Sequence, residues 1–338
     1  MYIPPFTITS EILRLISEIS ELVGTLTISL GNGVPSPMLR KANQIKTIHS
    51  SLAIEHNSLS LEQVTDVIEG RHVLGAPDEI QEVKNALQAY KLMQQLDAFS
   101  ERDLLKAHGL MMKDLVDKSG VYRNTGVGVF DGGRCIHMAP PAMRVPQLMK
   151  ELFEWVSTTD IHPLISSSVF HYEFEFIHPF IDGNGRMGRY WQTMLLSRWK
   201  KLFAWIPVET IIKAHQKEYY DAIAQSDANG DSTVFIEYML RCLLDSVKQY
   251  TLDKVTDKVT DKVTDKVTDK VTDKSLTKTE HNILKLISDN PNITINEICS
   301  RLKLSDSGVR KNLVSLRKKS VIERVGANKN GYWKIINL

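Results

Sequence analysis

The chain has 338 residues, of which 42% are hydrophobic and 24% charged, and this composition is typical of a globular protein with two or three domains. No apolar run approaches the ~18 residues needed to cross a bilayer, and residues 1–5 lack the basic and apolar regions of a signal peptide. The three cysteines are scattered and odd in number, which excludes a disulfide framework and favours a cytoplasmic protein.

The net charge of +2 conceals an asymmetry along the chain. Residues 276–338 hold 12 Lys or Arg and 5 Asp or Glu, a net charge of +7, so the remainder carries −5. A basic tail on a mildly acidic body indicates two domains with different partners.

Residues 1–250 carry apolar side chains at helical spacing, for example at Ile12, Leu15, Ile16 and Ile19. Proline and glycine interrupt the pattern at residues 35–37 and 75–77. We expect an N-terminal helical region over residues 1–100 and a second helical region, the core of this body, over residues 101–250.

One short stretch of this body favours strands instead of a helix. Val127, Val129, Ile136 and Met138 flank the turn residues 131–133, Asp-Gly-Gly, which predicts a β-hairpin over residues 126–138. A lone hairpin in a helical body can be a binding edge or a mere connection, and the pattern leaves both readings open.

Residues 178–189 carry the chemistry, and they read His-Pro-Phe-Ile-Asp-Gly-Asn-Gly-Arg-Met-Gly-Arg. Pro179 ends a helix at His178, and residues 182–185 can turn several backbone N–H groups toward an anion. Arg186 and Arg189 then share one side of the first turn of the next helix, whose N-terminus also favours anions. This arrangement predicts a polyphosphate site with an imidazole at its rim.

The segment resembles the signature of the Fic family, HPFx[DE]GNGRxxR, and matches it at every fixed position. The resemblance extends over about residues 1–250 and includes His162-Pro163-Leu164, Tyr219-Tyr220 and Gly230-Asp231. Fic proteins are helical, and most transfer AMP from ATP to a Ser, Thr or Tyr hydroxyl of a target protein. The resemblance therefore implies a protein adenylyltransferase that also modifies itself.

The resemblance also implies roles for single residues. His178 would be the general base, and Asp182 would bind Mg²⁺, the expected cofactor. The remaining residues of the ATP-binding set are Gly183, Asn184, Gly185, Arg186, Met187, Gly188, Arg189 and Tyr220. The hairpin at 126–138 would be the flap that docks the target protein by strand addition. Asp227 stands where some relatives have Asn.

Many Fic proteins contain an inhibitory helix with the pattern [ST]xxxE[GN]. Residues 51–55 fit this pattern from Ser51 to Glu55, but His56 follows where Gly or Asn is usual, and Asn57 comes one residue later. The resemblance implies that the helix around residues 47–57 inhibits the enzyme because Glu55 pairs with Arg189. The alternative is that Glu55 is an ordinary helix charge.

Residues 253–272 repeat Asp-Lys-Val-Thr five times. A period of four drifts by ~40° per repeat against the 3.6-residue turn, so the valines form no single stripe, and an alternating strand would have no apolar face either. We predict a polar linker over residues 251–275 and leave open both a transient helix and a role as an oligomerisation or partner-binding stalk.

Residues 276–338 have three apolar helical patterns followed by a hairpin pattern around residues 328–331, the order of a winged helix. The third helix would begin after Ser305 and present Arg310, Lys311, Arg317, Lys318 and Lys319. These side chains suit DNA phosphates, although a winged helix can also dock on proteins.

The predicted fold class is thus mainly α, with a helical Fic domain, a short β-hairpin flap and a small C-terminal winged helix-turn-helix domain. Three other functions remain open: transfer of a different phosphate-containing group such as UMP, removal of AMP from a target, and DNA-binding regulation with a nucleotide-sensing body. The exposed faces of a helical body also allow a homodimer.

Overall fold

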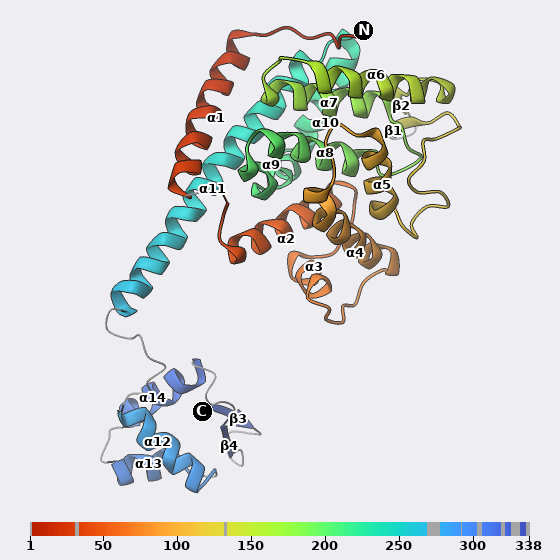
Figure 1. The fold of residues 1–338 in the computed structure, drawn as a ribbon. Coiled ribbons are helices and arrows are strands. Elements are labelled where there is room, and N and C mark those ends of the chain that lie inside the picture. Colours follow the sequence, from red (N-terminus) through yellow and green to blue (C-terminus); the bar gives the residue numbers. More distant parts are fainter. Residues whose placement is uncertain are drawn as a thin grey trace. The chain divides into compact units, whose positions relative to one another are not determined.

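The computed structural model describes residues 2–30, 34–131, 134–268, 278–291, 293–302, 306–318, 322–325 and 332–335. The chain forms two compact units, residues 1–255 and residues 256–338 (Figure 1). Each unit has its own cluster of buried apolar side chains.

The described part of the first unit is almost entirely helical. Its helices are α1 (Ser10–Ser29), α2 (Pro37–Ile54), α3 (Leu61–Ile68), α4 (Pro77–Leu92), α5 (Glu101–Met111), α6 (Val145–Thr158), α7 (Pro163–Ile177), α8 (Asn184–Trp199), α9 (Val208–Ala214), α10 (Gln216–Asn229) and α11 (Thr233–Thr268), with short 3-10 turns at Met93–Gln95, Ala142–Arg144 and Lys201–Trp205.

Local sequence signals explain where several of these helices begin. Thr9, Ser36 and Ser100 accept hydrogen bonds from the first turns of α1, α2 and α5, and Ser60 forms a complete capping box with Gln63 at α3. Proline occupies the first turn of α2, α4, α6 and α7, where its missing N–H costs nothing.

Helices α7 and α8 lie in the middle of the first unit and pack against each other (Figure 1). Nearly every residue of α7 and most of α8 are buried, as expected for helices enclosed on all sides. One core extends from Ile12 of α1 to Tyr250 of α11. The regions that the sequence separated near residue 100 therefore share a single core.

The hairpin is present at the predicted place. Strand β1 (Gly128–Asp131) pairs antiparallel with β2 (Arg134–Met138), with Gly128 opposite Met138 and a bulge between Val129 and Phe130. Strand β2 approaches α10, which brings the hairpin toward the same side of the unit as the end of α7.

The repeat differs from its prediction as a polar linker. Helix α11 continues through it to Thr268, and residues 269–275 lie outside the described part. Extending a helix that is already anchored by buried Phe235 and Val247 costs much less than starting one.

The second unit is a winged helix-turn-helix domain. It contains α12 (Lys278–Asp289), α13 (Ile295–Leu302), α14 (Asp306–Lys318) and the antiparallel strands β3 (Ile322–Val325) and β4 (Tyr332–Ile335). Its buried side chains are Ile283, Leu284, Ile287, Ile293, Ile298, Val309, Leu313, Leu316, Ile322 and Trp333.

Most of the basic surface predicted for this domain cannot be placed. The side chain of Arg317 on α14 is exposed. The side chains of Arg310, Lys311, Lys318 and Lys319 lie outside the described residues, as do Ser305 and the turn at 328–331.

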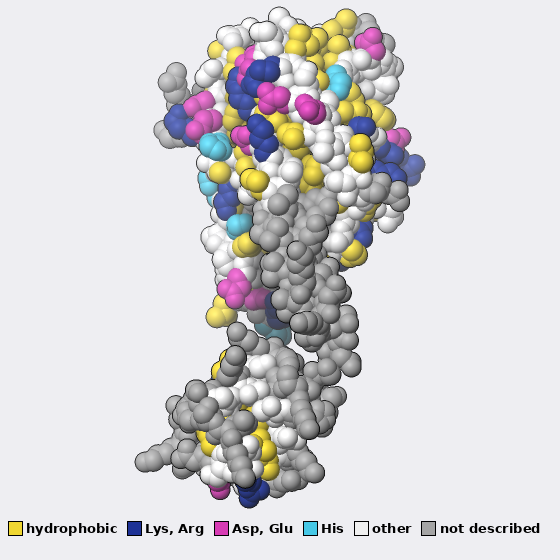
Figure 2. Space-filling model, turned by 90° about the vertical axis from the view of Figure 1, so that its left-hand side faces the viewer, with side chains coloured by type: hydrophobic (Ala, Val, Ile, Leu, Met, Phe, Trp, Pro, Cys, Tyr) yellow, Lys and Arg dark blue, Asp and Glu magenta, His cyan; other side chains and the backbone are white. Residues whose placement is uncertain are grey.

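The face of the first unit that includes α1 carries mixed charges. Figure 2 shows basic and acidic side chains next to one another on its upper part, and Arg14 of α1 pairs with Glu11 and Glu18. Lys248 and Arg241 of α11 pair with the same two carboxylates. This described surface therefore has no single-sign patch. Among the described helices, none is both long and apolar enough to span a membrane.

Candidate active site

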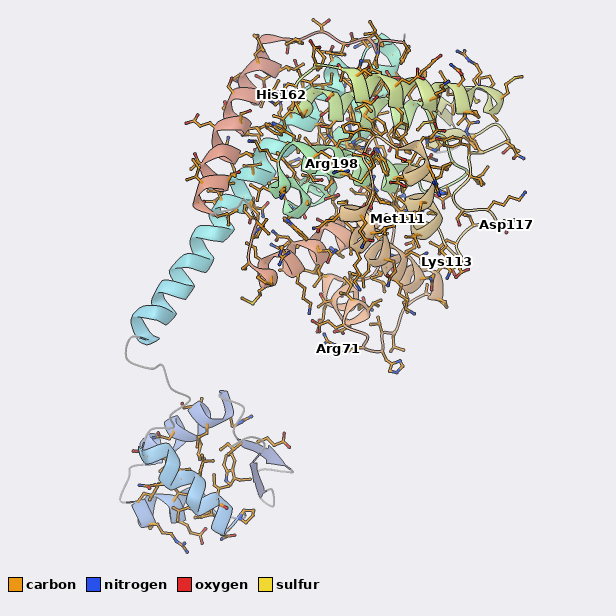
Figure 3. All side chains as sticks on the ribbon, in the orientation of Figure 1. Arg71, Met111, Lys113, Asp117, His162 and Arg198 are labelled. Carbon is orange, nitrogen blue, oxygen red and sulfur yellow. The ribbon has the colours of Figure 1, made fainter. Side chains whose placement is uncertain are left out.

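The loop 178–183 connects the two central helices. Helix α7 ends at His178, which adopts a left-handed conformation with φ of 49°, and Gly183 precedes α8 with φ of 82°. His162 precedes α7 and Arg198 lies in the last turn of α8, and both are labelled in Figure 3. They mark the ends of these two helices that the loop does not connect. The His162-Pro163-Leu164 motif therefore starts the helix that carries the loop and lies remote from it.

The backbone of α7 determines which nitrogen of His178 can act as a base. Nδ1 of His178 lies 3.3 Å from the carbonyl oxygen of Glu175. A carbonyl only accepts hydrogen bonds, so Nδ1 carries the proton and the lone pair is on Nε2. This is the tautomer that a general base at the rim of the loop requires.

Arg123 holds the entrance of the loop. Its guanidinium donates to the carbonyl oxygens of His178 at 2.7 Å and Ile177 at 3.2 Å. It also donates to Thr125 and Pro140, at 2.9 and 2.6 Å, which lie on either side of the hairpin. A single buried side chain thus fixes the loop and the segments on both sides of the hairpin.

His108 of α5 holds the other end of the loop. Its Nδ1 accepts from Gly120 N–H at 2.8 Å, so its Nε2 donates to the carbonyl oxygen of Asp182 at 3.0 Å. The ring stacks on Phe180 with a centroid distance of 3.6 Å. Burial lowers the pKa of His108 to about 4, so this brace stays neutral near pH 7.

The structure gives Asn184 a task inside the loop. Its side-chain amide accepts from the backbone N–H of Phe180 at 2.9 Å and donates to the carbonyl of Phe180 at 3.0 Å. The side-chain amide of Asn184 thus fixes the loop, and the backbone N–H groups at the start of α8 are positioned to face a phosphate.

A cavity of about 160 Å³ opens beside the loop. It is lined by Glu55, Glu175, His178, Gly185, Arg189, Tyr219, Tyr220, Ile223, Ala224 and Asp227. The cavity brings together Gly185, Arg189 and Tyr220 from the predicted ATP-binding set. Asp227, whose role the sequence left open, accepts from the Tyr172 hydroxyl at 2.8 Å.

Glu55 and Ser51 both contact Arg189. Oε1 of Glu55 lies 2.7 Å from Nη2 of Arg189, whose guanidinium also donates to the carbonyl and hydroxyl oxygens of Ser51, at 3.0 and 3.2 Å. Arg189 is only 2% exposed. Burial would lower the pKa of Arg189, but the Glu55 carboxylate raises it overall, so the guanidinium remains charged.

Two glycines provide the space that these contacts need. A Cβ at Gly185 would lie 2.3 Å from Oε1 of Glu55, and one at Gly188 would lie 2.5 Å from Oε1 of Glu175. Gly188 therefore accommodates a carboxylate of α7 and does not line the cavity. Met187 is fully buried in the core because it projects from the opposite side of α8.

Arg186 has a separate pair of carboxylate partners. Its Nη1 lies 2.7 Å from Oε1 of Glu82 on α4, and its Nη2 lies 3.1 Å from Oδ1 of Asp182. Glu82 also accepts from Asn57 at 2.7 Å, just after the end of α2. The sequence offered no signal for Glu82, because an acidic residue on a helix is usually a solvated charge.

Asp182 fits the role of a magnesium ligand. Its side chain is 56% exposed, and Oδ1 accepts from Gly183 N–H at 2.6 Å as well as from Arg186. No cluster of three or more metal-binding side chains occurs among the described residues. One carboxylate beside a triphosphate is nevertheless sufficient for Mg²⁺, which usually takes its other ligands from phosphates and water.

Glu175 is the least satisfied carboxylate in the cavity. Its side chain is 10% exposed, and Oε1 has no hydrogen-bond partner among the described residues, with Nε2 of His171 at 3.7 Å. Burial would raise the pKa of Glu175, but His171, His178 and Arg189 together hold it below its usual value. A buried anion therefore lies close to the candidate base.

These features define a helical protein with a candidate phosphate-binding loop, the imidazole of His178 at a fixed position, and the Glu55 carboxylate paired with buried Arg189. Residues 98–196 match the model of the Fic/DOC family, and residues 276–323 match a winged helix-turn-helix DNA-binding model. A crystal structure of a Fic family protein from Desulfovibrio desulfuricans is 43% identical, with a TM-score of 0.72, and the match covers 100% of this chain and 99% of that one. The chain belongs to the Fic family.

Curated relatives bear the name protein adenylyltransferase Fic. The protein from Culex quinquefasciatus is 30% identical over 213 residues, and that from Nematostella vectensis is 26% identical over 232 residues. These matches cover 60% and 63% of this chain, but only 40% and 51% of the relatives' own lengths. Fic-1 from Caenorhabditis elegans, at 20% identity and a TM-score of 0.58, shares the fold over 72% of this chain and 73% of its own.

Proposed function

We propose that the protein transfers AMP from ATP to a hydroxyl group of a target protein and of its own chain. The observation that carries this proposal is that His178, whose Nδ1 faces the Glu175 carbonyl, lines the same cavity as Gly185 and Arg189. The relatives named protein adenylyltransferase support the same reaction.

In the proposed reaction, the target hydroxyl oxygen attacks the α-phosphorus of ATP and its proton passes to Nε2 of His178. The bond from the α-phosphorus to the bridging oxygen breaks, and pyrophosphate leaves. The N–H groups at the start of α8 and the guanidiniums of Arg186 and Arg189 stabilise the growing phosphate charge. Asp182 would hold Mg²⁺, which neutralises part of that charge. The flap at 126–138 would hold the target segment by strand addition.

We propose further that the chain is autoinhibited. The Glu55 carboxylate pairs with the guanidinium of Arg189, which the γ-phosphate would need as its partner. Its Oε1 also lies directly beside Gly185. A phosphate in the same place would have to displace a partly buried, charge-assisted ion pair. The resting protein should therefore bind ATP poorly in its productive position.

The test is incorporation of label from ATP and Mg²⁺ into protein. We expect Glu55→Gly to label strongly, the unchanged chain weakly, and Glu55→Gly with His178→Ala not at all. Label on the α-phosphate should be retained and label on the γ-phosphate should not, with a gain of one AMP in intact mass. Retention of the γ-label would indicate transfer of phosphate. Incorporation of UMP from UTP would indicate a different nucleotide, and loss of mass from a modified target would indicate removal of AMP.

A second proposed function is DNA binding by the winged helix, and the match of residues 276–323 to a DNA-binding family supports it. Exposed Arg317 on α14 is one described side chain able to contact phosphate. The two functions are compatible, because a DNA-bound tail would place the nucleotide-binding body near a chosen target or operator.

A further inference from the structure

A second cavity lies against α2 and shares no lining residue with the candidate active site. Its volume is about 290 Å³, and α2, α9 and α11 form most of its wall. The lining residues are Asn43, Lys46, His49, Ser50, Leu61, Pro207, Thr210, Lys213, Ser246, Gln249 and Tyr250. The proposed enzymatic mechanism uses none of them.

Basic side chains dominate the charge of this cavity. Lys46 and His49 come from α2 and Lys213 comes from α9, whereas no Asp or Glu is among the lining residues. All three are partly buried, and Lys213 has no ion pair with any residue in the described part of the chain. Burial, together with the neighbouring Lys213 ammonium, lowers the pKa of His49, so the positive charge of the cavity comes from its lysines.

Polar groups line the floor of the cavity. The hydroxyls of Ser50 and Thr210 lie 3.3 Å apart, and either can donate. Asn43 is fixed by its hydrogen bond to the Trp205 carbonyl at 2.9 Å, and both Asn43 and Ser50 are nearly fully buried. Hydroxyl groups and lysines in one cavity can replace the water that a multiply charged oxyanion loses on binding.

We propose that this cavity is a binding site for a small phosphate-bearing anion. Lysine is a frequent phosphate ligand because its ammonium is a compact point charge with three donors. A volume near 290 Å³ corresponds to roughly ten water molecules at ~30 Å³ each, which suits phosphate, pyrophosphate or a nucleoside monophosphate better than a larger cofactor.

An anion bound at this site would affect the position of α2. A bound anion would join Lys46 and His49 of α2 to Lys213 of α9, and so would stabilise the observed position of the helix that ends at Glu55. Any ligand that prefers one position of α2 shifts the population toward it. This coupling rests on the proposed autoinhibition, whereas the binding site itself does not.

Titration calorimetry on the full chain tests the site, with phosphate, pyrophosphate and AMP as separate probes. We expect at least one probe to bind, and Lys213→Met to weaken that binding at least tenfold. Lys217→Met is the matched control, because this lysine is 84% exposed and pairs with Asp221. Lys46→Met provides a second test if Lys213→Met fails to fold. Absence of binding, or equal binding by folded Lys213→Met and the unchanged chain, overturns the proposal.

A second measurement tests the coupling. Saturating phosphate should reduce ATP labelling of the unchanged chain several-fold, but should leave labelling of Lys213→Met and of Glu55→Gly unchanged. Equal suppression in all three would assign the effect to competition at the active site and overturn the coupling. If Glu55→Gly shows no labelling, the proposed enzymatic function fails, and calorimetry still decides whether the anion site exists.

Discussion

The residue after Glu55 has an unusual backbone conformation that explains why Gly or Asn is usual at this place in the family pattern. His56 has φ of 70°, in the left-handed region. Glycine reaches this region without strain and asparagine at little cost, whereas other residues with a Cβ pay about 1 kcal/mol. Gly or Asn is thus preferred because the chain turns at the end of α2 through a left-handed residue. His56 adopts this conformation with some strain.

His56→Gly should therefore stabilise the fold by about 0.5–1 kcal/mol, since glycine relieves the strain but adds freedom to the unfolded chain. We also expect weaker ATP labelling, because the turn holds Glu55 in place. Urea unfolding and labelling measure the two effects. His72→Gly, in an exposed segment without positive φ, should give no stabilisation, and a stability gain equal to that of His56→Gly would refute the strain argument.

Glu209 predicts a pH dependence of stability. This side chain is 1% exposed, and burial raises its pKa to about 7. The folded state then binds a proton more tightly than the unfolded state, so the contribution of Glu209 to stability declines as pH rises from about 4.5 to about 7. Glu209→Gln should gain stability relative to the unchanged chain across this window, by up to about 3 kcal/mol.

Urea unfolding at pH 5 and pH 8 measures this difference. Glu62→Gln, on the exposed surface of α3, is the matched control and should show a pH-independent offset. An offset for Glu209→Gln that is the same at both pH values would show that the buried carboxylate is not protonated in the folded state.

At the scale of elements, α4 connects the end of α2 with the start of α8. Asn57 donates to Oε2 of Glu82 at 2.7 Å, and the other oxygen of Glu82 holds Arg186. The two motif arginines are therefore both bound by carboxylates of the N-terminal region, Arg189 by Glu55 and Arg186 by Glu82.

Asn57→Ala should loosen this connection. We expect increased labelling in the otherwise unchanged chain, no further increase in Glu55→Gly, and a stability loss of about 1–2 kcal/mol from the unsatisfied Glu82. Asn85→Ala is the control, because Asn85 is also buried on this side but hydrogen-bonds to Lys113 and Gln81. If Asn85→Ala raises labelling equally, the effect comes from general destabilisation and not from the Asn57–Glu82 contact.

The sequence predicts the elements better than it predicts the contacts between them. The helical body, the hairpin and the winged helix follow from apolar periodicity and turn residues, and the loop 178–189 follows from its dense motif. Arg123, His108 and Glu82 carry no such signal, because each acts through backbone atoms or side chains far along the chain. The period of the repeat gives no core and so predicts a polar linker, whereas the continuation of α11 into it depends on the buried part of that helix.

At the scale of the whole molecule, the two units predict separable behaviour. If the winged helix binds DNA, log K should fall linearly with log salt, and the slope should shrink by about 1 for Arg317→Met. Fluorescence anisotropy of a DNA duplex with the full chain measures both. Arg14→Met, in an ion pair on α1, is the control and should change nothing. Binding that persists in a chain ending before residue 276 would place the DNA contact on the first unit.

The single core of the first unit limits how the proposed autoinhibition could be relieved. Ser51, Leu52 and Ile54 of α2 are buried among the side chains that also support α8, so withdrawing this helix would expose the interior that stabilises the catalytic loop. An activator that pulled α2 away would therefore also disrupt the packing of α8 and of the loop that precedes it. Under the proposed autoinhibition, activation would be a small rearrangement confined to the last turn of α2 and the Glu55 side chain, and the basal labelling rate would report how often thermal motion produces it unaided.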